Sequence, residues 1–267
     1  MNSTLNAEVV IPFELVNGLI VVEAEVDGRV GNFIVDSGSN SILLNGDNSS
    51  SNVSFETLEG NIEGTEKRIN TLRIGNFEQK ELLGFTTDLS NLESYLDKEV
   101  HGILGCAIFT PHSIVFDFNS SQLIVSDHKI DQNIKESLNQ LSYFLIEDLP
   151  ITQLTIQGEL YNFILDSGAS SHFIDSDLLD NNIMNAQLTG KSKTIVTAGG
   201  KGLIAEEYKI KIADFSKEDL ISNLTGYKKD FSGASKELGA KISGLLSLSK
   251  LASQKIYFDV VDKKLYF

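Results

Sequence analysis

Asn32-Phe33-Ile34-Val35-Asp36-Ser37-Gly38 decides the fold, because this stretch occurs twice in the chain. It returns 130 residues later as Asn162-Phe163-Ile164-Leu165-Asp166-Ser167-Gly168, with six of the seven residues unchanged. Just upstream, Asp27-Gly28 and Gln157-Gly158 follow short alternating segments, which is typical of a tight turn between two strands. Each copy therefore predicts a β-hairpin whose second strand ends at the aspartate.

A second pair of matching segments indicates that the whole chain is an internal duplication. Gly102-Ile103-Leu104-Gly105, with the apolar segment 114–118 after it, corresponds to Gly244-Leu245-Leu246-Ser247 with the segment 256–260 after it. These landmarks are 142 residues apart, so the second copy carries 12 additional residues. We expect the insertion within 214–240, where polar residues and glycines accumulate.

The remaining segments are short, rich in β-branched and aromatic residues, and interrupted by Gly, Asn or Asp, a pattern that favours strands. We expect an all-β protein with two similar lobes and a few short helices. Residues 1–128 would form the first lobe and residues 142–267 the second.

Two helices are expected. Ser90-Asn91-Leu92-Glu93 has the capping-box pattern and predicts a short helix that ends near Lys98. Ile130, Ile134, Leu138 and Leu141 recur at helical spacing, so the linker 129–141 between the lobes is expected to be an amphipathic helix.

The composition excludes several classes of function. The chain has 22 Lys and Arg against 37 Asp and Glu, a net charge of −15, whereas nucleic acids and anionic membranes need a cationic surface. No apolar run approaches the ~18 residues of a membrane span. The single cysteine, Cys106, cannot form an intramolecular disulfide, and no Cys/His cluster suggests zinc. We therefore expect no nucleic acid, no membrane-spanning segment, no metal and no cofactor.

The N-terminal residues 1–8 are polar and lack the basic and apolar regions of a signal peptide. Two localisations stay open: a cytoplasmic protein, or a periplasmic or secreted protein whose export segment has been removed.

Each repeated aspartate follows three apolar residues and precedes Ser-Gly. The apolar run anchors the strand in the core, and the glycine allows the backbone to turn or to approach a neighbour closely. One such tripeptide would indicate only a turn, but duplicated lobes tend to pack about a pseudo-twofold axis, where equivalent turns can meet. Two adjacent carboxyls would share one proton and so provide an acid and a base together. That pair can activate a water and polarise an amide carbonyl, without a metal or a covalent intermediate.

The sequence resembles a clan of aspartic peptidases that includes the retropepsins and the pepsin-like enzymes. In that clan each lobe carries Asp-Thr-Gly or Asp-Ser-Gly, then a flap hairpin, then a hydrophobic-hydrophobic-Gly element. Asp36-Ser37-Gly38 and Asp166-Ser167-Gly168 match the first element, and Ile103-Leu104-Gly105 matches the last. The resemblance implies a bilobal acid-protease fold with two pseudo-twofold-related, β-barrel-like lobes, in which Asp36 and Asp166 are catalytic. Because the lobes are compact and alike, a single-chain, fused retropepsin-like endopeptidase fits best.

The resemblance also implies that an extended peptide or protein substrate binds as a strand, and that the protein is a monomer because one chain holds both lobes. It assigns support of the active-site turns to Ser37, Gly38, Ser39, Ser167 and Gly168. The hydroxyls of Ser37 and Ser167 would join the two turns. The Ser39 hydroxyl would bond the neighbouring carboxylate, and Ala169 stands at that place in the second copy. Since such a bond favours ionisation, Asp36 is expected to ionise more readily than Asp166.

Two glycine-rich stretches are expected at the tips of mobile flaps that close over a substrate strand. The candidates are Gly60, Asn61 and Ile62 in the first copy and Gly199, Gly200 and Lys201 in the second. The alternative is an ordinary tight turn in each case. The second stretch also lacks the spacing of a phosphate-binding loop.

The chain departs from the clan at two places. Ser247 stands where a glycine is expected, and the first tyrosine is Tyr95, past the first flap, so the flap tyrosine of the pepsins is missing. These departures affect substrate binding more than the chemistry. Outside these elements, His172 is expected at the surface or between the lobes, and Cys106 as a small buried side chain.

Two rival interpretations stay open. A peptide-binding or inhibitor-like protein could keep the bilobal fold without cleaving its ligand, because a fold does not establish an activity. A dimerisation module built from two β lobes would explain the repeat but not the paired aspartates. The aspartate kept in each copy favours an aspartic endopeptidase that activates water between Asp36 and Asp166.

Overall fold

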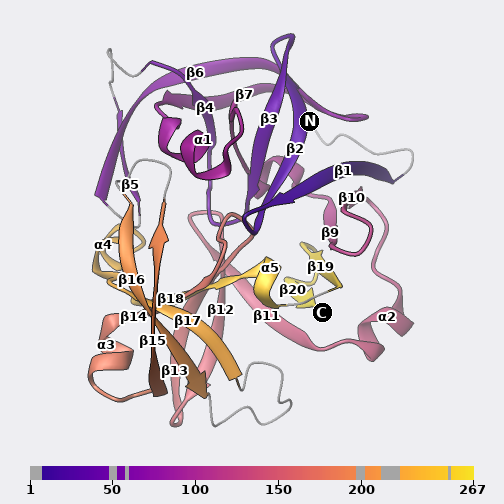
Figure 1. Ribbon diagram of the computed structural model, residues 1–267. Coiled ribbons are helices and arrows are strands. Elements are labelled where there is room, and N and C mark those ends of the chain that lie inside the picture. The colour runs from indigo at the N-terminus through magenta and orange to yellow at the C-terminus, as the bar shows by residue number, and fades with distance from the viewer. Residues whose placement is uncertain (1–7, 48–52, 58–59, 197–201, 212–222, 252–253) are drawn as a thin grey trace.

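The computed structural model describes residues 8–47, 53–57, 60–196, 202–211, 223–251 and 254–267. In these residues the chain forms twenty strands, five short α-helices and one 3-10 turn. Figure 1 shows two β lobes, with the first half of the chain in the upper lobe and most of the second half in the lower one. The prediction of an all-β, two-lobed protein is confirmed.

The two lobes share one topology. In the first lobe, β3 (Arg29–Asp36) pairs in parallel with β8 (Gly102–Gly105), and β8 pairs antiparallel with β4 (Ile42–Asn45). In the second lobe, β13 (Glu159–Asp166), β18 (Ile242–Ser247) and β14 (His172–Asp175) repeat these pairings. The exposed start and buried end of β3 and β13 follow from their sequences, polar first and apolar just before the aspartate.

The other elements complete each lobe. In the first they are β1 (Val9–Val16), β2 (Leu19–Val26), β5 (Val53–Thr57), β6 (Gly60–Ile74), β7 (Phe77–Thr87) and α1 (Ser90–Leu96). In the second they are β11 (Gln140–Ile146), β12 (Leu149–Ile156), α3 (Ser176–Asp180), β15 (Asn185–Ile195), β16 (Leu203–Lys211), β17 (Asn223–Lys229), α4 (Ser232–Glu237) and α5 (Leu248–Leu251).

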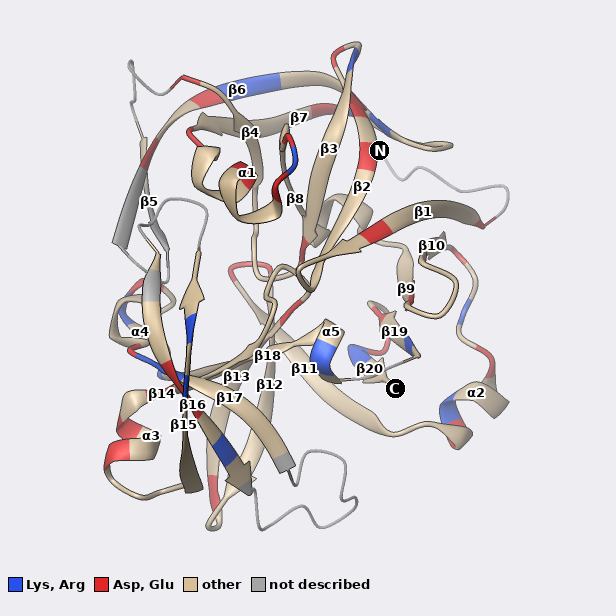
Figure 2. Cartoon of the chain, viewed as in Figure 1, with Lys and Arg blue, Asp and Glu red and all other residues tan. Residues whose placement is uncertain are grey.

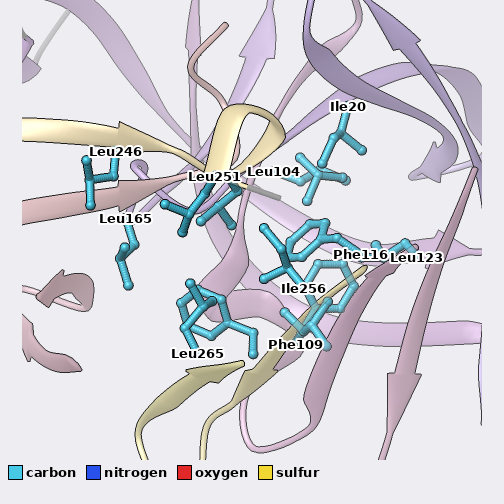
Figure 3. Packing of buried hydrophobic residues seen from close by; sticks show 14 of the residues in the cluster. Ile20, Leu104, Phe109, Phe116, Leu123, Leu165, Leu246, Leu251, Ile256 and Leu265 are labelled. Carbon is cyan, nitrogen blue, oxygen red and sulfur yellow. The ribbon is translucent and has the colours of Figure 1, made fainter. Parts of the chain in front are cut away.

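A six-stranded antiparallel sheet joins the lobes. Its strands run in the order β1, β10 (Gln122–Ser126), β9 (Ser113–Asp117), β19 (Lys255–Asp259), β20 (Lys264–Tyr266) and β11. The central pair brings Phe116 opposite Ile256, one residue from each copy of the repeat. The apolar side chains of both lobes meet in one core at this sheet, where Figure 3 shows Leu104, Phe116 and Ile256 close together. The lobes are therefore bound through both backbone and core.

The short helix at 90–96 is confirmed, but the predicted capping box is not formed. The N-cap residue of α1 is Leu89, which has no side-chain cap, and the Glu93 carboxylate accepts a hydrogen bond from the amide of Val100 instead. Leu89 is fully buried. Core packing therefore sets the start of this helix.

The helix predicted for the linker 129–141 is present, but it is shorter than predicted. The structure has only α2 (Gln132–Ser137), with no buried residue, and Leu141 lies in β11 opposite Leu265 of β20. Pairing with a strand at the far end of the chain overrides the helical spacing of the apolar residues. The lobe limits 1–128 and 142–267 stay a prediction.

Charges are distributed over both lobes. Figure 2 shows Asp and Glu on strands, helices and turns throughout the molecule, with Lys and Arg among them. No helix in the described ranges has both the length and the apolar character to cross a membrane.

Candidate active site

The two Asp-Ser-Gly turns meet where the lobes join. Asp36 ends β3 opposite Gly105, and Asp166 ends β13 opposite Ser247. A Cβ atom added to Gly38 would lie 2.6 Å from Cγ of Asp166, and one added to Gly168 would lie 2.2 Å from Cγ of Asp36. Each glycine thus lies directly against the aspartate of the other lobe. No larger residue fits there, and the two carboxyl groups are brought side by side.

The surroundings of the two carboxyls favour one shared proton. Burial raises the pKa of Asp36, while hydrogen bonds with Asp166 and with the amides of Gly38 and Gly168 lower it in part. Burial, and then the charge of Asp36, raise the pKa of Asp166 well above its ordinary value. Asp166 is 7% exposed, whereas Asp36 is only half-buried. The arrangement favours a protonated Asp166 beside an ionised Asp36.

Two serines cross-link the two Asp-Ser-Gly turns. The Ser37 hydroxyl donates to the carbonyl of Leu165 at 2.8 Å and accepts from the amide of Ser167 at 2.9 Å. The Ser167 hydroxyl donates to the carbonyl of Val35 at 2.9 Å and accepts from the amide of Ser37 at 2.9 Å. These four buried hydrogen bonds fix the distance between the two aspartates.

Ser39 does not take its predicted role. Its hydroxyl donates to the carbonyl of Ser41 at 3.1 Å and accepts from the amide of Ser41 at 3.3 Å, so it is engaged within its own loop. Short polar side chains commonly satisfy nearby backbone in this way. The prediction that the Ser39 hydroxyl bonds the carboxylate is wrong, and it is the Ser39 backbone amide that bonds Asp36 and helps to lower its pKa. A lower pKa for Asp36 stays a prediction, now attributed to its greater exposure.

Ser247 is accommodated by a second change, at His172. In the first lobe a Cβ at Gly105 would lie 2.6 Å from the carbonyl oxygen of Ser39. In the second lobe the Ser247 hydroxyl donates to the equivalent carbonyl, that of Ala169, at 2.6 Å, and its amide donates to Nδ1 of His172 at 3.1 Å. The serine is thus built into the turn by hydrogen bonds.

His172 is 3% exposed, so the expectation of a surface position is wrong, whereas an interlobe position stays a prediction. Burial lowers the pKa of His172 to about 4, and the neutral ring can accept the Ser247 amide. His172 occupies the place of Ile42 in the repeat. Two coupled departures from the repeat, Gly to Ser and Ile to His, were the signal in the sequence for this pair.

Cys106 follows β8 and is half-buried beside the pair of aspartates Asp36 and Asp166, which we call the dyad. Burial and the charge of Asp36 raise the pKa of its thiol. A neutral thiol is a poor nucleophile. In the part of the chain that the structure describes, no group of three or more His, Cys, Asp or Glu could hold a metal ion.

A cavity of about 460 Å³ lies over the two aspartates, with walls from both lobes. The walls of this cavity are mostly apolar, and Leu19, Ile103 and Leu149 are among the residues that form them. Val196, just past the end of β15, also lines the cavity and packs against an apolar cluster of the first lobe. A hairpin of the second lobe thus reaches across to the first.

The first flap candidates lie at the start of β6, where Gly60, Asn61 and Ile62 pair with Thr57, Glu56 and Phe55 of β5. This hairpin approaches the second lobe, because β5 contacts α4. The second flap candidates, Gly199, Gly200 and Lys201, lie outside the described residues. A role of either group in binding substrate stays a prediction.

No known family profile matches the chain, and no curated protein matches it in sequence. Among solved structures, the chain is similar to the crystal structure of aspartic proteinase from Irpex lacteus, with 14% sequence identity and a TM-score of 0.54. The match covers 97% of this chain and 96% of that chain. At this identity the likeness shows the fold alone. The predicted bilobal acid-protease fold is confirmed.

Proposed function

We propose that this protein is an aspartic endopeptidase whose catalytic residues are Asp36 and Asp166. The observation that carries the proposal is the juxtaposition of the two repeated carboxyls, each against the other lobe's glycine, at the base of a cavity large enough for peptide side chains. Their pKa directions, both raised by burial and that of Asp166 also by the charge of Asp36, suit a pair that holds one proton.

In the proposed reaction, ionised Asp36 takes a proton from a water bound between the carboxyls as the water oxygen attacks the peptide carbonyl carbon. Protonated Asp166 donates a hydrogen bond and then its proton to the carbonyl oxygen. The proton held by Asp36 then passes to the amide nitrogen as the C–N bond breaks. One hydroxyl of the tetrahedral intermediate returns its proton to Asp166 as the carbonyl re-forms, so the pair again holds one shared proton. The cross-linked serine turns hold the carboxyls at the required separation, which pre-organises the site.

The substrate would be an extended segment of a peptide or an unfolded protein. The apolar walls on both sides of the dyad suit the side chains that flank the scissile bond, and the β5–β6 hairpin would cover the bound strand. Both carboxyls come from one chain, so catalysis would not need a dimer.

The test is cleavage of a denatured protein between pH 3 and pH 7 by the wild type and by Asp36→Asn and Asp166→Asn. We expect each substitution to lower kcat by about 10²- to 10⁴-fold, the usual contribution of an acid or base. Asp131→Asn is the control, because an asparagine at that position would still cap α2 far from the cavity. Equal cleavage by all variants would refute the mechanism. A wild type that binds peptides but cleaves none of a broad library would favour the peptide-binding alternative.

A further inference from the structure

The cavity over the dyad has two halves, one from each lobe, and the residues that line one half correspond in the repeat to residues that line the other. Leu19 corresponds to Leu149 and Ile34 to Ile164, each 130 residues apart, and Ile103 corresponds to Leu245, 142 residues apart. All six line the cavity, three from each lobe. A peptide strand that crosses the dyad therefore meets one apolar pocket from the first lobe and one from the second.

The two pockets differ in shape. Leu92 of α1 lines the first pocket, and its equivalent Ala234 of α4 lines the second. Leu43 of the first corresponds to Phe173 of the second, at another part of the wall. Next to its helix, the second pocket thus has a smaller side chain in its wall than the first.

The mouths of the pockets differ in charge. Tyr95, at the last turn of α1, lines the first pocket, and Glu237, at the end of α4, holds the equivalent place in the second. The β1–β2 turn touches Tyr95, because Asn17 donates from Nδ2 to the Tyr95 carbonyl at 2.8 Å. The equivalent of Asn17 in the β11–β12 turn is Glu147, which also lines the cavity. The second lobe thus contributes two carboxylates to the cavity lining, where the first lobe has Asn17 and Tyr95 at the equivalent places.

The other charges around the cavity agree with this difference. Among the described lining residues the charged ones are the dyad, Glu147 and Glu237, all of them acidic. Lys193 is close by, but its Nζ is held by the hydroxyls of Ser170 and Ser171 at 3.0 and 3.2 Å. Glu147 and Glu237 are exposed, so a cation placed beside them would keep part of its hydration.

We infer that the second-lobe pocket binds a lysine or arginine side chain of the substrate, whereas the first-lobe pocket binds an aliphatic one. This inference rests on the proposed function. The methylene chain of lysine or arginine would lie along Leu149, Ile164 and Ala234, with its charged end at Glu237 and Glu147. Long cationic side chains commonly bury their stems and keep their charge at the edge of an apolar surface.

The experiment measures binding separately from cleavage. Three hydroxyethylene-linked peptide analogues, which cannot be hydrolysed, carry norleucine on both sides of the linkage, lysine on one side, or lysine on the other. Affinities are measured by calorimetry for the wild type, Glu237→Gln and Glu147→Gln/Glu237→Gln. Glu159→Gln, an exposed acidic residue at the start of β13 and outside the cavity lining, is the control for the change in net charge.

We expect one of the two lysine analogues to bind the wild type about two- to fivefold more tightly than the norleucine analogue, as for a partly exposed ion pair. Glu237→Gln should reduce this ratio, and the double variant should abolish it, whereas Glu159→Gln should retain it. Ala234→Leu, which copies the first pocket, should weaken binding of the same lysine analogue. The preference should also shrink as salt rises from 0.05 to 0.5 M, because ions screen exposed charges.

The inference is overturned if the norleucine analogue binds at least as tightly as both lysine analogues, if the double variant keeps the preference, or if none of the three binds. Failure of the proposed function would look different. The wild type would then cleave no peptide, while the binding ratios would still decide which side chain the second pocket takes.

Discussion

At the scale of single residues, Asp166 is held in a place that favours its neutral form. Burial and the neighbouring charge of Asp36 raise its pKa above the ordinary value of 3.8. At pH values between the pKa of Asp166 in the unfolded chain and its higher pKa in the folded protein, the folded protein binds more protons than the unfolded chain. The free energy of unfolding therefore falls as pH rises through that range. The group that would serve as the acid therefore lowers stability at neutral pH.

Asp166→Asn should remove this penalty. We expect the variant to gain stability relative to the wild type as pH rises from 4 to 7, by an increase in Tm of about a few degrees at pH 7. Scanning calorimetry across this range measures the difference. A Tm difference for Asp166→Asn that is the same at pH 4 and pH 7 would contradict the raised pKa.

The pH dependence of cleavage offers a second prediction. Because activity needs one proton on the pair, kcat/KM should follow a bell-shaped curve whose alkaline limb lies above the ordinary carboxyl pKa of 3.8, at the raised pKa of the pair. Ser39→Ala should leave the acidic limb in place, because the Ser39 hydroxyl bonds the Ser41 carbonyl. A shift of that limb by half a pH unit or more in Ser39→Ala would show that the hydroxyl reaches Asp36 in solution.

The sequence was informative for residues whose role the repeat makes visible. Asp36, Asp166 and their glycines could be predicted, because each motif needs the other to explain it. The contacts of Ser39 and His172 could not. A serine can bond any carbonyl within reach, and the burial of a histidine depends on which strand packs over it. The one indication of the contact between Ser247 and His172 in the sequence is that both residues differ from their equivalents in the first copy, Gly105 and Ile42.

At the scale of elements, β8 and β18 hold equivalent places but tolerate different residues. Gly105 of β8 leaves no room for a side chain, since an added Cβ would lie 2.6 Å from the Ser39 carbonyl oxygen and 2.9 Å from that of Ser41. Ser247 of β18 already carries a Cβ, and its hydroxyl bonds the Ala169 carbonyl. The same close contact between the strand end and the loop after Asp-Ser-Gly is thus made by a glycine in the first lobe and by a hydrogen-bonded serine in the second.

Placing alanine at each position should separate the two cases. Gly105→Ala should destabilise by about 1–3 kcal/mol through crowding and should lower kcat/KM, because the displaced loop adjoins Asp36. Ser247→Ala should cost about 1 kcal/mol for its lost hydrogen bond. Urea denaturation and peptide cleavage measure both. If Gly105→Ala were as stable and as active as the wild type, the packing of β8 against this loop would be looser than the structure shows.

The helices show where local patterns lose to tertiary contacts. The capping box at Ser90 gave the correct place for α1 but the wrong cap, because Leu89 is anchored in the core. The helical spacing around Ile134 extended too far, because Leu141 pairs with Leu265 in the sheet that joins the lobes. Propensity alone is a weak guide when a strand can add backbone hydrogen bonds.

At the scale of the whole molecule, the repeat predicted two lobes and a shared site, but not the sheet that joins them. The β9–β19 pair brings together Phe116 and Ile256, which lie in different copies of the repeat. Each of these strands is a short apolar segment that could pair with many others, so its partner cannot be chosen from local sequence. The pseudo-twofold arrangement of the lobes explains why β9 pairs with β19, since the two strands are equivalent in the repeat and meet at the axis.

One core and one six-stranded sheet extend through both lobes, so the lobes should unfold together. Hydrogen exchange followed by mass spectrometry in increasing urea should show β2 and β12 losing protection at the same concentration. Ser167→Ala removes the interlobe bond to Val35 and leaves the Ser37 amide without its acceptor, at a cost of about 1–3 kcal/mol. Both lobes should then open at a lower, still common, urea concentration. Ser142→Ala, on the exposed face of β11, should change stability by less than about 0.5 kcal/mol. If one lobe of Ser167→Ala lost protection while the other kept its wild-type midpoint, the lobes would be separate folding units, and the site between them would depend on docking rather than on a shared core.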